Sequence, residues 1–461
     1  MIGERTQMEN QIVIEEKLSK KLRRVALPIA AQSLIASSLG LVDNLMVGHL
    51  GETELAAVGL STQFTFIFWM VLFGFSGGAI TYMAQFFGKK DMHNIRRVTG
   101  ITITVALSIG LIFFCVSFFA PALVIGIFTN IPSIIEIGTP FVRLTAFIFP
   151  VWAIVVPLTA AMKATQQTSI PLKISIVVFS LNTVLCVLLI NGFFGFPKMG
   201  IMGAAVATVA SRCVELALYL IVVFARKNII AGPIREFFSW HRDLFSRVLA
   251  NATPTMLNET LWAVGITLYN AAYGRVGVTE FAAVQAGNTI FNLFSLACFS
   301  IGDAMLILCG EKLGRGEKVA AFDMAKKILK IAIIIGAVCG AILIVTSQFI
   351  VRLFEFTDEG LYYATLILVV YGITLFIKIH NASILTGALR AGGDTRVGLL
   401  IDIGSVWCIG VPLAFLGALV FGLPIYLVVA LVQIEEIVKF FIMRRRFFSK
   451  KWVRDLVADI E

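Results

Sequence analysis

Charged side chains are scarce in this sequence. They make up 14% of its 461 residues, whereas a soluble domain carries roughly 25%. Hydrophobic residues make up 58%, which is more apolar surface than a water-soluble core can bury. Mostly apolar stretches of about twenty residues recur along the chain, and each is long enough to cross the hydrocarbon layer of a bilayer. The composition therefore predicts a protein that crosses a membrane many times.

Strand-like alternation of polar and apolar residues is also lacking. The apolar runs are too long for the strands of a membrane barrel, so the backbone polar groups must be satisfied within helices. The predicted fold class is an all-α integral membrane protein. The opening residues are too charged, and the first apolar run too long, for a cleaved signal peptide.

Motifs for metal, nucleotide or nucleic-acid binding are missing. The seven cysteines form no CxxC pair and no Cys/His cluster, so they read as packing residues rather than disulfides or metal ligands. The pattern GxxxxGK[ST] is absent, which argues against a cycle driven directly by ATP. The formal charge of +10 is scattered through short loops, which excludes a basic nucleic-acid-binding module. We expect no cofactor and no metal.

Twelve spans are expected. They lie near 25–48, 56–87, 98–127, 135–161, 169–191, 199–224, 249–273, 281–309, 328–352, 361–387, 398–420 and 423–443. Most Lys and Arg residues fall on the side of the N-terminus, whereas the opposite side holds Lys198, Arg275 and Arg352. The positive-inside rule then places both termini in the cytoplasm. We expect a multi-pass protein of the inner or plasma membrane, present as a monomer.

An internal repeat relates the two halves of the chain. A shift of 226 positions (254 minus 28) matches Pro28 to Pro254, and the same shift matches the sequences TELAAV at 53–58 and TEFAAV at 279–284. Two parallel repeats of six spans are related by an axis along the membrane normal, and substrate is expected between them. The predicted parts are an N-terminal segment (1–24), an N-lobe (25–226), a linker (227–248), a C-lobe (249–443) and a basic C-terminal segment (444–461).

Three stretches resemble the multidrug and toxic compound extrusion (MATE) transporters. They are VDNLMVGHLGETELAAVGL at 42–60, LNETLWAVGITLYNAAYGRVG at 257–277 and GALRAGGDTR at 387–396, and the resemblance covers essentially the whole chain. It implies a V-shaped pair of six-helix bundles and alternating access. It also implies export of amphipathic, often cationic compounds driven by H⁺ or Na⁺.

An ionisable side chain inside the membrane costs free energy, so each one calls for a structural or functional explanation. At 1.5 Å per residue, Asp43 lies about 28 Å from Arg24, in the outer half of the first span. It could be a capped interfacial carboxylate, but the resemblance maps it onto the N-lobe acid that couples ion entry to drug release. Asn182 and Thr208 resemble its supporting residues. The family pattern often has an acid where this chain has Cys186, and a thiol favours H⁺ over Na⁺.

A second candidate coupling site involves Glu259 and Lys378. Each lies about 18 Å from an arginine at the cytoplasmic end of its span, close to the membrane midplane. The resemblance maps Glu259 onto a C-lobe carboxylate associated with cation binding in part of the family. This sequence departs from that branch, because Ile379 stands where a second carboxylate is expected. The pair can be a coupling site or a purely structural ion pair.

The remaining candidates are a substrate cavity and two hinges. Aromatic side chains can stack on cationic drugs, although most aromatic residues in such a chain face lipid or core. The cavity candidates are Gln32, Phe64, Trp69, Trp152, Trp262, Tyr269, Phe291 and Asn381. Pro28 and Pro254 favour kinks in equivalent spans, which can be hinges or static packing features. Arg212 and Glu215 are three residues apart and are expected to pair locally.

Secondary active efflux by antiport is the predicted function. A flippase of lipid-linked oligosaccharides or other lipid precursors is the alternative, but that branch often has more spans and a more charged cavity. An enzyme or a channel would need clustered catalytic His and Asp residues or a repeated pore loop. Neither pattern occurs in the sequence, so we expect a transporter and not an enzyme.

Overall fold

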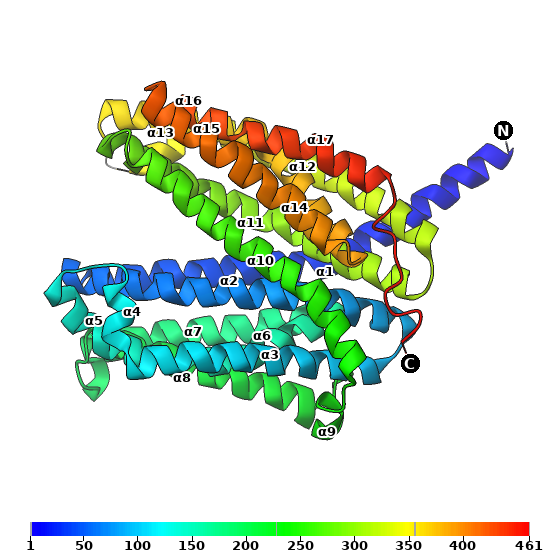
Figure 1. Cartoon of the computed structure of the whole chain (residues 1–461), viewed down its shortest axis with the longest axis horizontal. Helices are drawn as coiled ribbons and strands as arrows, with labels where there is room; N and C mark the ends of the chain where they lie inside the picture. Colours follow the sequence, from blue (N-terminus) through cyan, green and yellow to red (C-terminus); the bar gives the residue numbers. More distant parts are fainter. Residues whose placement is uncertain (1, 227, 355, 461) are drawn as a thin grey trace. The chain divides into compact units, whose positions relative to one another are not determined.

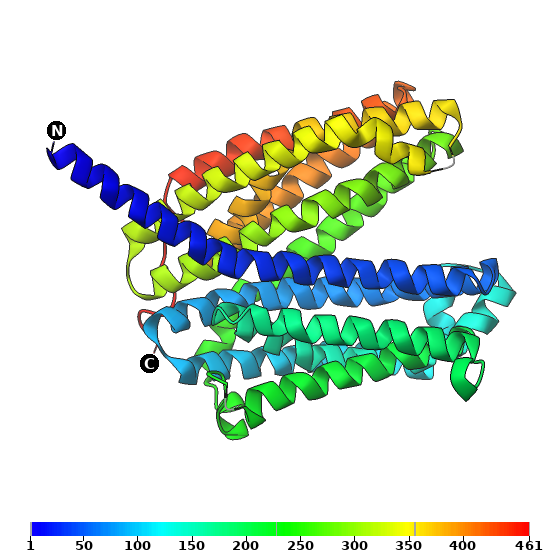
Figure 2. The same cartoon turned by 180° about the vertical axis from the view of Figure 1, so that it is seen from behind.

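Helices account for all regular structure in the described part of the chain. The computed structural model describes residues 2–226, 228–354 and 356–460, and Figures 1 and 2 show it from opposite sides. This confirms the all-α membrane fold predicted from composition. The elements are α1 (Ile2–Gly48), α2 (Glu52–Lys89), α3 (Met92–Phe119), α4 (Pro121–Gly126), α5 (Pro132–Thr145), α6 (Ile148–Ala164), α7 (Ser169–Asn191), η1 (Phe193–Gly195), α8 (Ile201–Leu220), η2 (Ile221–Ala225), α9 (Ile234–Phe237), α10 (Arg242–Tyr273), α11 (Val278–Gly314), α12 (Lys318–Ile350), η3 (Val351–Leu353), α13 (Asp358–Ala382), η4 (Ser383–Leu389), α14 (Thr395–Ser405), η5 (Val406–Gly410), α15 (Val411–Phe415), η6 (Leu416–Val420), α16 (Ile425–Val432) and α17 (Ile434–Phe448).

Each of the twelve predicted spans coincides with a helix or with consecutive helices. Among the described residues, nine helices are long and apolar enough to cross a membrane, or up to ten if α5 and α6, bent by 45°, count as one span. The other two predicted spans correspond to α10 and to α16 with α17. These two are more polar, since α10 carries Glu259 and α17 carries Glu435, Glu436 and Lys439.

The described chain forms two compact units. Unit 1 contains residues 1–31, 166–169 and 264–455, and unit 2 contains residues 32–165, 170–263 and 456–461. The division therefore cuts α1 and α10, each of which contributes to both units. In unit 2, α2 packs on α3, α5 and α6, and α8 packs on α5 and α6. In unit 1, α13 packs on α11, α12, α16 and α17.

Glycines allow α2 and α10 to approach closely within unit 2. A Cβ atom added to Gly74 would lie 2.6 Å from the Cα of Met256, and one added to Gly78 would lie 2.4 Å from the Cα of Ala252. The amide of Asn251 also donates to the carbonyl of Gly78 at 2.9 Å. Small residues four apart are a common way for membrane helices to bring their backbones together.

The last described residues, 456–460, complete unit 2. The backbone N–H of Leu456 donates to Gln85 at 2.7 Å, and the Lys89 ammonium donates to the carbonyl of Val457. Asp459 accepts from Arg247 at 2.9 Å. The hydrogen bond from Arg247 lowers the pKa of Asp459, so this contact is fully formed above the ordinary carboxyl pKa and is lost as the pH falls through the lowered value.

Candidate functional site

Asp43 lies in a small polar site inside unit 2. The Sγ atom of Cys186 is 3.7 Å from Oδ1 of Asp43 and 3.7 Å from Oδ1 of Asn182. Asn182 and Cys186 are one turn apart on α7, so both side chains point from the same face. The amide of Asn182 donates to Thr208 on α8 at 3.5 Å. The three residues predicted for the N-lobe site, and Cys186 with them, are therefore neighbours in the structure.

The donor set of this site combines oxygens with one thiol. Thr208 already donates to the carbonyl of Ala204 at 2.9 Å and accepts from Asn182. The oxygens of Asp43 and Asn182 both lie beside the thiol of Cys186. A hard cation needs several oxygen ligands around one point, whereas a proton needs one carboxylate oxygen and a neighbour that tolerates both protonation states.

Arg212 and Glu215 pair locally, as predicted. Nη1 of Arg212 is 2.7 Å from Oε2 of Glu215. The guanidinium also lies 4.9 Å from the centroid of the Trp152 ring, and Trp152 contacts Trp69 at 5.4 Å between centroids. The guanidinium of Arg212 therefore covers one face of the Trp152 ring, which was predicted to bind substrate.

Glu259 and Lys378 belong to different units. Glu259 is half-buried in unit 2, and its Cγ would lie 3.1 Å from a Cβ added to Gly74. Lys378 is half-buried in unit 1, where its ammonium lies 4.9 Å from the centroid of the Phe291 ring. The predicted ion pair between Glu259 and Lys378, whether coupling site or structural pair, stays a prediction.

A group of buried charges in unit 1 escaped the sequence analysis. Nζ of Lys439 lies 2.8 Å from Asp402, 3.7 Å from Glu435 and 3.6 Å from Glu436. All four side chains are at most 7% exposed. We call Asp402, Glu435, Glu436 and Lys439 the Lys439 cluster. The side chain of Asp402 is only 6% exposed, so it is shielded from water.

Polar neighbours hold the carboxylates of the Lys439 cluster in place. The hydroxyl of Tyr269 lies 2.5 Å from Oε2 of Glu435. The amide of Asn381 donates to Oε2 and to the backbone carbonyl of Glu436, both at 2.8 Å. Nδ1 of His380 lies 3.1 Å from Oδ1 of Asn381. The cluster thus draws together α10, α13, α14 and α17.

Three residues predicted for the substrate cavity are buried near this cluster. Tyr269, Phe291 and Asn381 are 5%, 6% and 2% exposed, and Phe291 also packs on Tyr371 with ring centroids 4.8 Å apart. Their role in binding substrate stays a prediction, but each already has a partner inside unit 1.

The other predicted residues lie elsewhere. Gln32 donates to Ser175 at 3.4 Å, Phe64 contacts Phe113 at 4.9 Å between centroids, and Trp262 is half-buried. Pro28 and Pro254 lie inside the long helices α1 and α10. Their role as hinges stays a prediction.

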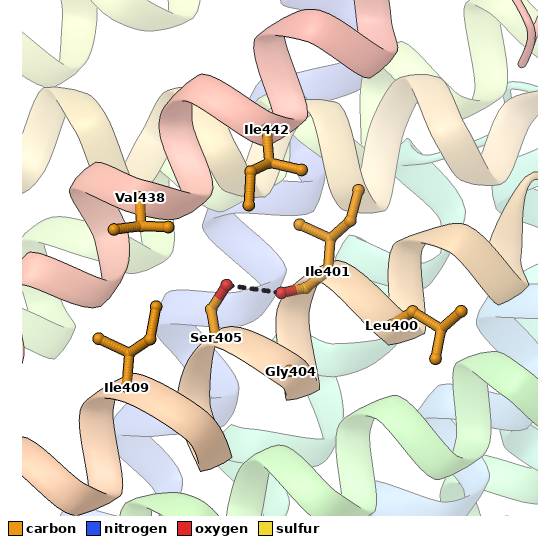
Figure 3. A pocket seen from close by; sticks show the side chains of 7 residues that line it. All are labelled: Leu400, Ile401, Gly404, Ser405, Ile409, Val438 and Ile442. Carbon is orange, nitrogen blue, oxygen red and sulfur yellow. Dashed lines mark hydrogen bonds between the residues drawn. The ribbon is translucent and has the colours of Figure 1, made fainter.

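An apolar groove of 290 Å³ runs along unit 1 (Figure 3). It is lined by Leu400, Ile401, Gly404, Ser405, Ile409, Val438 and Ile442. Leu400 is 72% exposed, and the hydroxyl of Ser405 donates to the carbonyl of Ile401 at 2.7 Å. The groove is an outer surface without charged groups, and none of the predicted cavity residues lines it.

Two multidrug resistance proteins are similar to this chain over most of their length. It is 24% identical over 449 residues to the probable multidrug resistance protein NorM of Thermotoga maritima, covering 96% of this chain and 95% of that protein. It is 25% identical over 399 residues to the probable multidrug resistance protein YoeA of Bacillus subtilis, covering 84% of each.

Solved structures share the fold. The MATE transporter VcmN of Vibrio cholerae in its bent form matches with a TM-score of 0.85 and 18% identity, over 95% of this chain and 99% of that one. A transporter of the MOP superfamily from Pyrococcus furiosus matches with a TM-score of 0.84 and 17% identity, over 94% and 97%.

A family model described as MatE matches residues 28–188 and 254–416, one segment in each half of the internal repeat. The matched segments cover well over half of the chain. Together with the all-helical membrane fold, this match means that the protein is a multi-pass membrane transporter and not an enzyme, and that it belongs to the MatE family.

Proposed function

We propose that this protein exports amphipathic, cationic compounds from the cytoplasm in exchange for protons that bind at Asp43. The names of its relatives support a multidrug substrate range. The observation that carries the choice of ion is the contact of Asp43 and Asn182 with the thiol of Cys186, each at 3.7 Å. The coupling ion is then H⁺, the termini are cytoplasmic, and the transporter works as a monomer in the inner or plasma membrane.

The proposed mechanism begins at Asp43 on α1. When Asp43 is ionised, its carboxylate can accept a hydrogen bond from the thiol of Cys186. When it is protonated, it becomes a donor, and the thiol can turn towards Asn182 instead. The two protonation states therefore favour different hydrogen bonds between α1 and α7. A difference in free energy between two arrangements is what allows a bound ion to bias a conformational equilibrium.

Asp43→Asn tests this function. The amide keeps the size of the side chain but cannot bind or release a proton in this range, so pH-driven export of a fluorescent cation from proteoliposomes should fall to the level of protein-free vesicles. Equilibrium binding of the same compound to the purified variant should remain, because the change leaves the fold intact. Export by Asp43→Asn at the rate of the unchanged protein would refute the assignment.

A matched experiment separates the ions. The unchanged protein is reconstituted and driven first by a pH gradient at equal Na⁺, then by a Na⁺ gradient at equal pH. Export is expected only in the first case. Transport of a lipid-linked sugar in place of the cation would favour the flippase alternative.

A further inference from the structure

The Lys439 cluster carries more negative than positive charge. Asp402, Glu435 and Glu436 all lie within 3.7 Å of the single ammonium of Lys439. Lys378 also acts on Glu435, and the four salt-bridged side chains by themselves hold three acids and one ammonium, which on full ionisation is an excess of negative charge. Such a charge is expensive inside a membrane protein. Like charges that share a buried site are relieved when one carboxylate takes up a proton.

A metal cation does not fit this site as well as a proton does. The ammonium of Lys439 already occupies the point on which the three carboxylates converge, at distances of 2.8, 3.6 and 3.7 Å. A Na⁺ ion would need the same oxygens as ligands and would be repelled by that ammonium. A proton adds almost no volume and can bind to a carboxylate oxygen that does not face the ammonium of Lys439.

The partners point to where the proton binds. Asp402 has the shortest contact with Lys439 and is the best-compensated carboxylate. Glu435 is farther from the ammonium, and its Oε2 lies 2.5 Å from the hydroxyl of Tyr269. Gly410 on η5 makes this contact possible, since a Cβ there would lie 1.9 Å from that hydroxyl and 2.3 Å from Oε2 of Glu435.

From this geometry we infer that the Lys439 cluster is a second proton-exchange site, in which either Glu435 or Glu436 carries one proton that is separate from the proton at Asp43. Binding converts one carboxylate into a carboxylic acid, and release returns it, with no other bond made or broken. Tyr269 positions Glu435, and Asn381 positions Glu436. Because the cluster joins α10, α13, α14 and α17, its protonation state acts on how these helices pack in unit 1.

Other titratable and charged side chains surround the Lys439 cluster. The titratable and charged side chains that act on Glu435, on its partner Tyr269 and on the nearby Tyr273 and His380 come from several helices. They are Tyr269 and Tyr273 on α10, Tyr371, Lys378 and His380 on α13, Asp402 on α14, and Glu435, Glu436, Lys439 and Arg444 on α17.

Infrared spectroscopy of the purified full-length protein tests the inference without any transport assay. A protonated carboxyl group has its own carbonyl-stretch band. In the Asp43→Asn background, which removes the first site, this band should be present at mildly acidic pH and disappear as the pH rises. Its area should correspond to about one proton per chain. Failure of the proposed function at Asp43 would leave this readout untouched.

Four further variants assign the band. Glu435→Gln or Glu436→Gln should abolish it, whereas Glu236→Gln, which changes a carboxyl group of unit 2 that is paired with Arg96, should leave it unchanged. Tyr269→Phe removes the hydrogen bond that Tyr269 donates to Oε2 of Glu435, so the carbonyl-stretch band should shift in frequency. This last shift does not depend on whether the glutamine variants fold.

Other outcomes would overturn the inference. A band that is absent, or that does not change between mildly acidic and mildly alkaline pH, would mean a cluster with fixed charges. Loss of the band on addition of Na⁺ would mean that the site takes a metal cation. Survival of the band in the combined Glu435→Gln and Glu436→Gln variant would place the proton elsewhere.

Discussion

Among single residues, Cys186 is the one on which the proposed ion preference of the Asp43 site depends. It stands between the oxygens of Asp43 and Asn182, where a carboxylate would complete a set of hard ligands. A thiol is a weak hydrogen-bond donor and a poor ligand for Na⁺. The identity of this one side chain therefore sets the ion preference that we propose.

Cys186→Asp should give the transporter a response to Na⁺. The added carboxylate would place two acids and one amide oxygen around one point, and a bound cation would relieve their mutual repulsion. We expect export driven by a Na⁺ gradient to appear in proteoliposomes, at a rate at least about tenfold above that of the unchanged protein, which corresponds to about 1.4 kcal/mol. Cys186→Ser is the control, because it adds an oxygen without charge and should gain little.

The sequence allowed one of the two polar sites to be predicted and not the other. Asp43, Asn182 and Thr208 were identified by resemblance to a family pattern, and they are neighbours in the structure. Glu435, Glu436 and Lys439 were overlooked because they lie near the end of an apolar segment, where charges are usually solvated. Their spacing of three and four residues was a usable signal, since it places acids and lysine on one helical face.

Helix packing depends on the two glycines of α2. Gly74 and Gly78 let α2 meet α10 at backbone distance beside Asn251 and Glu259. Sequence analysis predicted the helices themselves, because hydropathy and length determine them. It did not predict this crossing, because glycines inside a membrane helix do not reveal which neighbour they face.

Gly78→Ala should destabilise the protein. The new Cβ would lie 2.4 Å from the Cα of Ala252 and 2.5 Å from the hydroxyl of Thr255, and such overpacking typically costs about 1–3 kcal/mol. Thermal unfolding of the purified protein should show a lower midpoint. Gly59→Ala is a matched control on the same helix, because nothing lies within 4 Å of a Cβ there. It should be neutral or slightly stabilising, and an equal loss in both variants would contradict the packing argument.

For the molecule as a whole, the membrane orientation follows from the distribution of Lys and Arg over the loops. The structure agrees with the predicted order of helices, and the sidedness stays a prediction. Single cysteines at 88–97, 310–327 and 388–397, in a chain whose seven native cysteines are replaced, should react with an impermeant reagent only from the cytoplasmic side. Arg275→Cys should react from outside. Labelling of any of the three loops from outside would reverse the topology.

The binding of residues 456–460 to unit 2 has a consequence for the order in which this protein matures during synthesis. Gln85, Lys89 and Arg247 are made early, but their partners Leu456, Val457 and Asp459 leave the ribosome only after residues 264–455 of unit 1. Unit 2 can insert its helices early, yet these three contacts of α2 and α10 form only after the second half has been translated. Translation that stops before residue 456 therefore leaves unit 2 without these three contacts.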